Sequence, residues 1–294
     1  MTMLKKKLSI EVVYGTLPPW PNSTILYTDD SAVLVDTLFM KSDAALLAKR
    51  IKEIGKPLEA IFLTHSHPDH VWGGVELLRH FPDAKIYARP LIRKEIELDF
   101  RARQLRWTGV FNVGPFEGEI PTDLFDIQPL EGDSYDFGGH EIQLVDLKPA
   151  ETVYATAFYV PEIKTYIAGD QLYNQCHYYI GAGLNRPDLW IESIEDVRAR
   201  FDIDVVVPGH GYVGGTEIFD EAIDYLSFYQ SQYEPYRPQI EMVQALENQY
   251  PDWKLEGVIY MTIGPAMTDP ALIDLTHGHI KFGEGTIAIG SYSA

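Results

Sequence analysis

Residues 64–70, Thr-His-Ser-His-Pro-Asp-His, gather three of the chain's nine histidines and one aspartate. Imidazole and carboxylate groups are the usual ligands of zinc and of other first-row metal ions. A short apolar run directly precedes the segment and predicts a buried strand. From a loop at a strand end, His65 and His67 can bind one ion, and Asp69 and His70 can come round the turn to bind a second. The segment therefore predicts a metal centre rather than a solvated polar loop.

Strands and helices alternate on both sides of this segment, which favours an α/β fold. Strands are predicted at Leu8–Tyr14, Thr24–Thr28, Ala32–Asp36, Ala60–Leu63, Lys85–Ala88, Ile142–Leu147, Ala155–Val160, Thr165–Ala168 and Val205–Val207. Helices are predicted at Ser42–Ile54, Val75–His80, Pro90–Trp107, Leu189–Phe201 and Thr216–Asn248, with Ser42 and Gly55 as caps of the first. The last forty or so residues show no clear period.

Two further predicted strands end in candidate ligands. Gly169-Asp170 follows one strand, and residues 208–211, Pro-Gly-His-Gly, follow another. Each places a metal-binding side chain, Asp170 or His210, beside a glycine, where the backbone can approach closely. Alone, Gly169-Asp170 is a weak signal and the Pro-Gly-His-Gly segment a moderate one, but together, in this order after the histidine segment, they strongly indicate a two-ion centre.

These three segments resemble the metallo-β-lactamase superfamily, in its broad hydrolase branch, over residues 23–215. The resemblance implies a four-layer αββα sandwich with the metal site at one edge of its two sheets. We expect a single domain over residues 1–294, with 216–294 as a helical and irregular C-terminal extension. By the same resemblance, His65 and His67 bind a first ion, Asp69, His70 and His210 bind a second, and Asp170 bridges both.

One position departs from the family pattern. The superfamily usually has a third histidine for the first ion in a loop before the bridging aspartate, and residues 148–152, Lys-Pro-Ala-Glu-Thr, stand there instead. We interpret Glu151 as the replacement ligand, since alkylsulfatases of the superfamily have a similar glutamate. The alternative is that Glu151 binds no metal and the first site is weak or empty.

The exchange alters the charge of the centre. Two divalent ions with Asp69, Asp170 and a bridging hydroxide sum to +1, and Glu151 lowers that sum to zero. A less positive centre should lower the pKa of bound water less strongly. Carboxylate also suits harder ions than imidazole does. We therefore expect two divalent ions, zinc first, with manganese or iron as alternatives at the first site.

The expected reaction is hydrolysis of a small-molecule ester, lactone, amide or related bond by a metal-bound hydroxide. The position of Asp69 suits it to orient that hydroxide or to move its proton. Tyr173 resembles the tyrosine that lactonases of the superfamily use near this point, so it is the candidate proton donor. Trp72, His177 and Tyr178 are the candidate substrate-binding residues, because aromatic walls suit small apolar molecules.

Two other functions remain open at this point. One is a redox enzyme of the same fold, such as a mononuclear iron dioxygenase, although such an enzyme would leave most second-site ligands unused. A flavodiiron protein is disfavoured, because His67 stands where that pattern has glutamate. The other is a non-catalytic protein that binds a small ligand, which the complete ligand set argues against.

The amino-acid composition disfavours several classes of binding partner. The formal net charge of −19 disfavours nucleic acid and anionic membranes. The single cysteine, Cys176, excludes a disulfide within the chain, and no apolar signal or spanning segment is evident. We therefore expect a cytoplasmic enzyme with a small-molecule substrate. The stretch from Thr216 onward could cap the active site or form a homodimer contact.

Overall fold

Two β-sheets form the centre of the computed structural model, which describes residues 7–17, 19–111, 117–180, 184–233, 237 and 239–260, and the strand segments 273–274, 279–282 and 285–288. The first sheet has the order β1-β2-β3-β4-β5-β6, antiparallel up to β3 and parallel beyond it. Its strands are Ser9–Tyr14 (β1), Asn22–Tyr27 (β2), Ala32–Val35 (β3), Leu58–Phe62 (β4), Lys85–Ala88 (β5) and Gln128–Pro129 (β6).

The second sheet has the order β11-β10-β9-β8-β7, and only its β10–β11 pair is parallel. Its strands are Ser134–Phe137 (β7), His140–Asp146 (β8), Thr156–Val160 (β9), Thr165–Tyr173 (β10) and Val205–His210 (β11), with a 3-10 turn at Pro161–Ile163. The parallel pairing brings the ends of β10 and β11 together, so that Tyr173 lies opposite His210. This register places the candidate ligands of both strands at one edge of the sheet.

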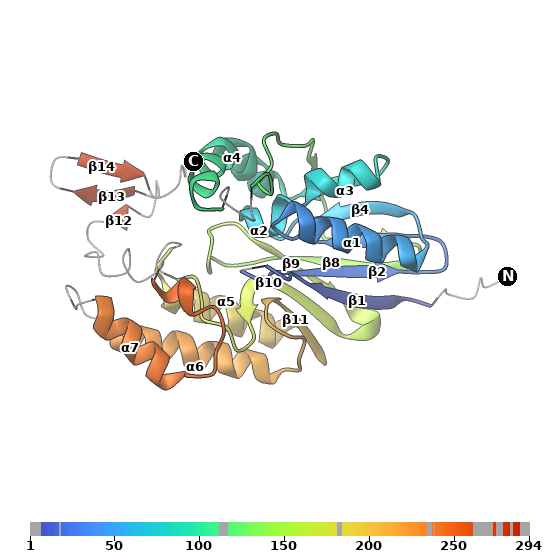
Figure 1. Ribbon diagram of the computed structural model, residues 1–294. Coiled ribbons are helices and arrows are strands. Elements are labelled where there is room, and N and C mark those ends of the chain that lie inside the picture. Colours follow the sequence, from blue (N-terminus) through green and yellow to red (C-terminus); the bar gives the residue numbers. More distant parts are fainter. Residues whose placement is uncertain are drawn as a thin grey trace.

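Helices cover the outer faces of both sheets (Figure 1). On the first sheet these are Lys41–Ile54 (α1), Pro68–Val71 (α2), Gly74–His80 (α3) and Pro90–Phe111 (α4). On the second sheet they are Pro187–Arg200 (α5), Glu217–Gln232 (α6) and Gln239–Gln249 (α7). Among the described helices, none has the length and hydropathy that crossing a bilayer requires.

Three separate apolar clusters hold the layers together. The cluster between the sheets contains Val35 and Phe62 from the first sheet and Phe158 and Ile167 from the second, all buried. A second cluster joins the first sheet to its helices, and a third joins the second sheet to α5, α6 and α7. Strands such as β4 and β11 are buried along most of their length and appear as short apolar runs, whereas β7 and β8 carry exposed polar residues. The expected four-layer αββα sandwich is therefore confirmed.

Several element boundaries differ from those predicted. Helix α1 begins one residue early, and its N-cap is Met40 rather than Ser42, whereas Gly55 ends the helix in the left-handed conformation, as predicted. Strand β10 continues through Asp170 to Tyr173, because glycine at 169 permits a bulge without ending the strand. Residues 273–288, for which no clear period was found, contain the three short antiparallel strands Ile273–Asp274 (β12), His279–Phe282 (β13) and Gly285–Ala288 (β14).

Candidate metal centre

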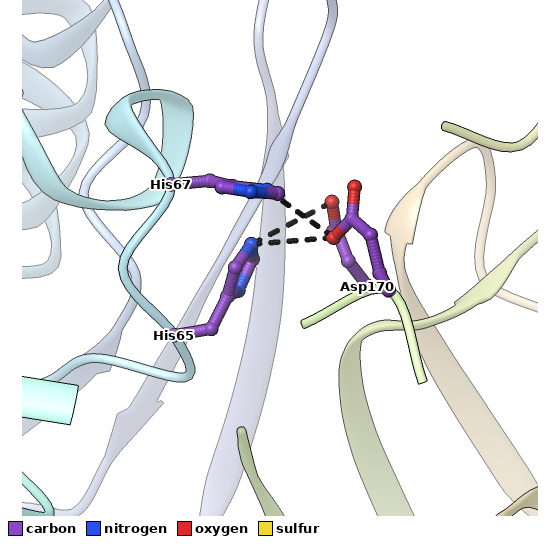
Figure 2. A group of neighbouring side chains, drawn as sticks. His65, His67 and Asp170 are labelled. Carbon is purple, nitrogen blue, oxygen red and sulfur yellow. Dashed lines mark ion pairs between the residues drawn. The ribbon is translucent and has the colours of Figure 1, made fainter. Parts of the chain in front are cut away.

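The candidate ligands converge from both sheets at one edge of the sandwich. His65 and His67 leave the loop after β4 of the first sheet and point across the gap toward Asp170, which lies on β10 of the second (Figure 2). Two contacts lock the sheets together here: the Thr156 amide donates to the Thr64 carbonyl (2.8 Å), and the Asn22 side chain donates to two carbonyls around β11. The site thus exists only where the two halves of the chain meet.

Four side chains form the first ligand group: His65, His67, Glu151 and Asp170. Each offers one ligand atom, and these atoms all lie within 4.8 Å of one another. Glu151 comes from the loop between β8 and β9, and its Oε2 lies 3.2 Å from His67 Nδ1 and 3.5 Å from His65 Nε2. This places the Glu151 carboxylate where the sequence analysis expects the replacement ligand.

The second ligand group contains Asp69, His70, Asp170 and His210, with the same 4.8 Å limit between ligand atoms. Asp170 Oδ1 lies 3.0 Å from His70 Nε2, and its Oδ2 lies 3.2 Å from His210 Nε2. Asp69 Oδ2 is 3.4 Å from His210 Nε2. Asp170 therefore belongs to both groups, as a residue that bridges two ions would.

The buried nitrogen and oxygen atoms of the centre are arranged to bind metal ions rather than to hydrogen-bond with one another. His65 Nε2, His70 Nε2, Glu151 Oε2 and Asp170 Oδ1 are buried and make no well-aligned hydrogen bond, although they lie within ion-pair range of one another. Buried polar atoms left in this state are costly unless something else satisfies them. Nitrogen and oxygen donors aimed at shared points match the coordination preferences of divalent zinc, manganese and iron.

A second layer of contacts fixes three imidazoles with Nε2 facing the centre. The Thr64 hydroxyl donates to Asp36 Oδ2 (2.8 Å) and lies 2.9 Å from His65 Nδ1. Asp36 Oδ2 also lies 2.8 Å from His70 Nδ1. His210 Nδ1 lies 2.9 Å from the carbonyl of residue 19. Since carboxylate and carbonyl oxygens only accept, His70 and His210 carry a proton on Nδ1, and Nε2 is the nitrogen that would bind a metal ion once its own proton is displaced.

Two glycines allow the second-sheet ligands to sit this close to the first sheet. A Cβ at Gly209 would lie 1.9 Å from Asp170 Oδ1, and a Cβ at Gly169 would lie 2.9 Å from that of Thr64. Gly169 also has a φ of 54°, which favours glycine. The glycines beside the ligands are therefore steric requirements of the centre, as the sequence pattern indicated.

Tyr173 lies against the two carboxylates of the first ligand group. Its hydroxyl is 2.9 Å from Asp170 Oδ2 and 3.1 Å from Glu151 Oε1. The ring is 2% exposed and stacks on Tyr178 with centroids 4.5 Å apart. The phenol thus holds Oε1 of Glu151 and leaves Oε2 free to face the two histidines.

The two ligand groups hold their histidines in different protonation states. Burial lowers the pKa of His65 to about 4 and lowers the pKa of His67 as well. Burial would also lower the pKa of His210, but the Asp170 carboxylate outweighs it and raises that pKa to about 9. His70 follows the same balance, and its pKa is raised. Burial, followed by repulsion from Asp170, raises the pKa of Glu151.

The structure places the three candidate substrate-binding residues in packed layers rather than on an open wall. Trp72 is 3% exposed and packs between Phe39 and Phe100 under the first sheet's helices, because its position after α2 turns the ring inward. The ring of His177 lies 3.1 Å from the Tyr225 hydroxyl. Tyr178 is buried, and its hydroxyl bonds the backbone of residue 173. All three thus support the walls of the site from behind.

Sequence reasoning missed Asp36, which orients both Thr64 and His70. It directly follows β3, the parallel neighbour of β4, and its φ of 61° turns the carboxylate under the histidine loop. The available signal was a carboxylate at the end of an otherwise apolar run beside the strand that carries the ligands. Such an edge is where parallel strands present functional side chains.

Comparison with known sequences gives the family. The model of the metallo-beta-lactamase superfamily matches residues 18–210. A hydroxyacylglutathione hydrolase from Brucella anthropi is 24% identical over 214 residues, which is 72% of this chain and 66% of the relative. A second, from Synechococcus sp., is 28% identical over 124 residues, or 42% of this chain and 38% of the relative. The matches thus span about two-thirds of the length of the Brucella relative and about two-fifths of the length of the Synechococcus relative.

Solved structures agree on the fold. A metallo-beta-lactamase from Pontibacter korlensis gives a TM-score of 0.56 at 20% identity, covering 77% of this chain and 97% of that one. The metallo-beta-lactamase DIM-1 gives 0.53 at 18% identity, covering 76% and 94%. With the family match over most of the chain, the layered fold and the two converging ligand groups, the protein belongs to the metallo-beta-lactamase superfamily.

Proposed function

We propose that this protein is a metal-dependent hydrolase of an ester, thioester, lactone, amide or related bond in a small molecule. The observation that carries the proposal is the pair of adjoining ligand groups that share Asp170. The relatives named hydroxyacylglutathione hydrolase support the reaction class. The dioxygenase and ligand-binding alternatives gain no support from the comparisons.

His65, His67, Glu151 and Asp170 would hold the first ion, and Asp69, His70, Asp170 and His210 the second. We propose zinc for both, with manganese or iron as alternatives beside Glu151, since a second carboxylate suits harder ions. Bound divalent ions would supply Lewis-acid polarisation of the scissile group and activation of water.

Asp69 is the candidate that handles the proton of the attacking water. Its side chain is 15% exposed, more than any partner in its group, and it borders an open cavity. Burial would raise its pKa, but His70 and His210 outweigh that effect and lower it. The carboxylate is therefore ionised at neutral pH and can accept a hydrogen bond from water.

The contacts of Tyr173 favour a positioning role over the role of proton donor to the leaving group. A leaving-group donor must reach the substrate, whereas the Tyr173 hydroxyl lies on Glu151 and Asp170. Burial raises its pKa well above the ordinary value, so the phenol keeps its proton. We infer that Tyr173 positions the two carboxylates, and that water or substrate supplies the proton to the leaving group.

The test is metal content joined to activity. Protein purified without added metal is analysed for zinc, manganese and iron, stripped with a chelator, and reloaded with each metal in turn. We expect two ions per chain and hydrolysis of at least one class in a panel of esters, thioesters, lactones and β-lactams. The exposed-surface variant Asp220→Asn, whose side chain pairs with Arg198, serves as the control and should keep both. Activity that survives complete stripping would contradict the proposal.

A further inference from the structure

A cavity of about 260 Å³ opens beside Asp69. Five separate segments contribute to its wall: the loop before β2, the loop after β3, the start of α2, the helix α4 and the segment after α7. The lining residues are Pro19, Trp20, Phe39, Pro68, Asp69, Trp107, Leu255, Glu256, Gly257 and Val258. Because Pro68 and Asp69 belong to the histidine loop itself, the cavity and the candidate metal centre share a wall.

Backbone contacts hold the C-terminal part of this wall in place. The Lys254 amide donates to the Gln175 carbonyl (2.8 Å), and the His177 amide donates to the Lys254 carbonyl (2.8 Å). Leu255 and Val258, which follow at once, are buried. The segment after α7 is thereby tied to the chain just beyond Tyr173, next to the ligands.

The opposite part of the wall is anchored as well. The buried carboxylate of Asp43 accepts hydrogen bonds from the amides of Thr16 and Leu17, which fixes the loop that carries Trp20. Phe39 and Trp107 meet edge to face, with ring centroids 6.1 Å apart. The cavity is therefore formed before any ligand enters, which lowers the entropic cost of binding.

The residues that line the cavity favour an uncharged, apolar ligand. Aromatic and aliphatic groups make up most of it, and its two ionisable residues, Asp69 and Glu256, are both acidic. None of the described residues that line it is lysine, arginine or histidine. A carboxylate carried into this space would lose its hydration and would find no cationic side chain among the described lining residues.

We propose that this cavity receives the uncharged, apolar acyl group of the substrate, while the bond to be cleaved lies at the metal centre. This assignment rests on the proposed hydrolase function and adds the substrate class. An apolar cavity of roughly 150 Å³ accommodates benzene, so the space beside Asp69 suits a medium-length alkyl chain or a substituted ring. Glu256 adds a second negative charge to the wall, which repels a negatively charged chain terminus.

The first test is a series of p-nitrophenyl alkanoates from acetate to decanoate with the zinc-loaded protein. We expect kcat/KM to rise about fourfold per methylene, the fold-change equivalent to ~0.8 kcal/mol, until the cavity is full. The mono-p-nitrophenyl ester of suberate has the length of the octanoate but ends in a carboxylate. It should react at least tenfold more slowly than the octanoate. A flat series, or equal rates for the matched pair, would overturn the assignment.

Variants locate the effect in this cavity. Trp107→Ala should enlarge it and move the optimum to longer chains, whereas Leu105→Ala, at a 61% exposed position on the same helix, should leave the profile unchanged. Glu256→Lys changes an exposed side chain and should raise kcat/KM for the suberate ester about tenfold without raising that for the octanoate. If Glu256→Lys favours neither ester, the cavity does not hold the acyl terminus.

A binding experiment separates this inference from the hydrolase proposal. Octan-2-one, an uncharged ligand that cannot be hydrolysed, is titrated calorimetrically into the zinc-loaded protein and into Trp107→Ala. Binding that weakens several-fold in Trp107→Ala but not in Leu105→Ala supports the cavity assignment even if no ester is turned over. Hydrolysis of short esters without any binding of octan-2-one would leave the hydrolase proposal standing and overturn the acyl-group assignment.

Discussion

The two ligand groups share Asp170 but differ in how the protein supports them. In the second group, Asp36 orients His70 and a main-chain carbonyl orients His210. In the first group, the Thr64 hydroxyl orients His65, and the Tyr173 phenol holds Glu151 in its loop. The second group is therefore supported by charge and main chain, and the first by two neutral hydroxyls.

The two ligand groups also differ in the charge around their histidines. The histidines of the second group face three carboxylates and have raised pKa values, so protons occupy them until a cation replaces those protons. The histidines of the first group are kept neutral by burial and are ready to bind metal. One centre thus contains a group that releases protons from its histidines on loading and a group whose histidines are neutral, in which burial raises the pKa of Glu151.

Removing Asp170 should have the largest effect on metal binding and activity, because both ligand groups contain this residue. Asp170→Ala is expected to lose both ions and to lower kcat by roughly a thousandfold, in keeping with the loss of metal-supplied charge stabilisation. Metal analysis and activity are measured on the same preparation, with Asp220→Asn as the matched aspartate control. Retention of one full ion equivalent would mean that the two groups do not depend on a common bridge.

Changing the support of the second group should affect that group most, because Asp36 contacts His70 directly and reaches His65 of the first group only through the Thr64 hydroxyl. Asp36→Asn replaces the acceptor of His70 Nδ1 with an amide that can donate, which disturbs the tautomer of the ring. Loss of such a contact typically costs about 10- to 100-fold in metal affinity. Competition with a zinc chelator should show one strongly weakened site per chain and a second site that changes much less. Equal weakening of both sites would show that the groups respond as one unit.

The protonation difference predicts a difference in pH dependence. Because the His210 pKa is raised to about 9, a proton competes with the metal ion for His210 Nε2 at every pH below that value. Affinity at the second group should therefore rise about tenfold per pH unit for each displaced proton between pH 6 and 8. Calorimetry in buffers of different ionisation enthalpy counts those protons. A flat profile with no proton release would contradict the assignment of protonated histidines.

The smallest expected effect concerns the phenol that holds Glu151. Tyr173→Phe should weaken the first site about tenfold, the lower end of the usual range for a supporting contact. In the Glu151→His background the same change should cost less metal affinity, since the phenol then holds only the Asp170 carboxylate. Metal affinities of the four proteins form a double-mutant cycle. An equal loss in both backgrounds would assign Tyr173 a general packing role.

The fold was largely predictable because most strands are buried on both faces and appear as short apolar runs. Lys85–Ala88 coincides with the predicted strand, and α5 differs by two residues at its start. The prediction stopped β10 short at Ala168, since a glycine and an aspartate usually end a strand. Tertiary pairing with β11 overrides that local preference. The antiparallel strands of 273–288 carry no period that distinguishes them from irregular chain.

The histidine segment, Asp170 and His210 could be proposed from sequence because each follows an apolar run, and Glu151 because it stands where the superfamily pattern has a ligand. The residues that support these side chains could not. Asp36 and the carbonyl of residue 19 act on rings far along the chain, and only the fold shows these contacts. Trp72 illustrates the opposite error, since an aromatic residue two positions after His70 can face either the cavity or the core. A short helix, α2, turns it inward.

The Asn22 side chain, which donates to the carbonyls of Pro208 and Gly211, has a consequence for how the molecule assembles. These bonds and the ligands themselves join parts of the chain nearly two hundred residues apart, so neither half can complete the centre alone. Any ion that binds the docked halves but not the separate ones stabilises the folded chain by mass action, by about 2.7 kcal/mol at a hundredfold excess over its Kd. Metal supply in the cell would then govern the lifetime of this protein as well as its catalysis.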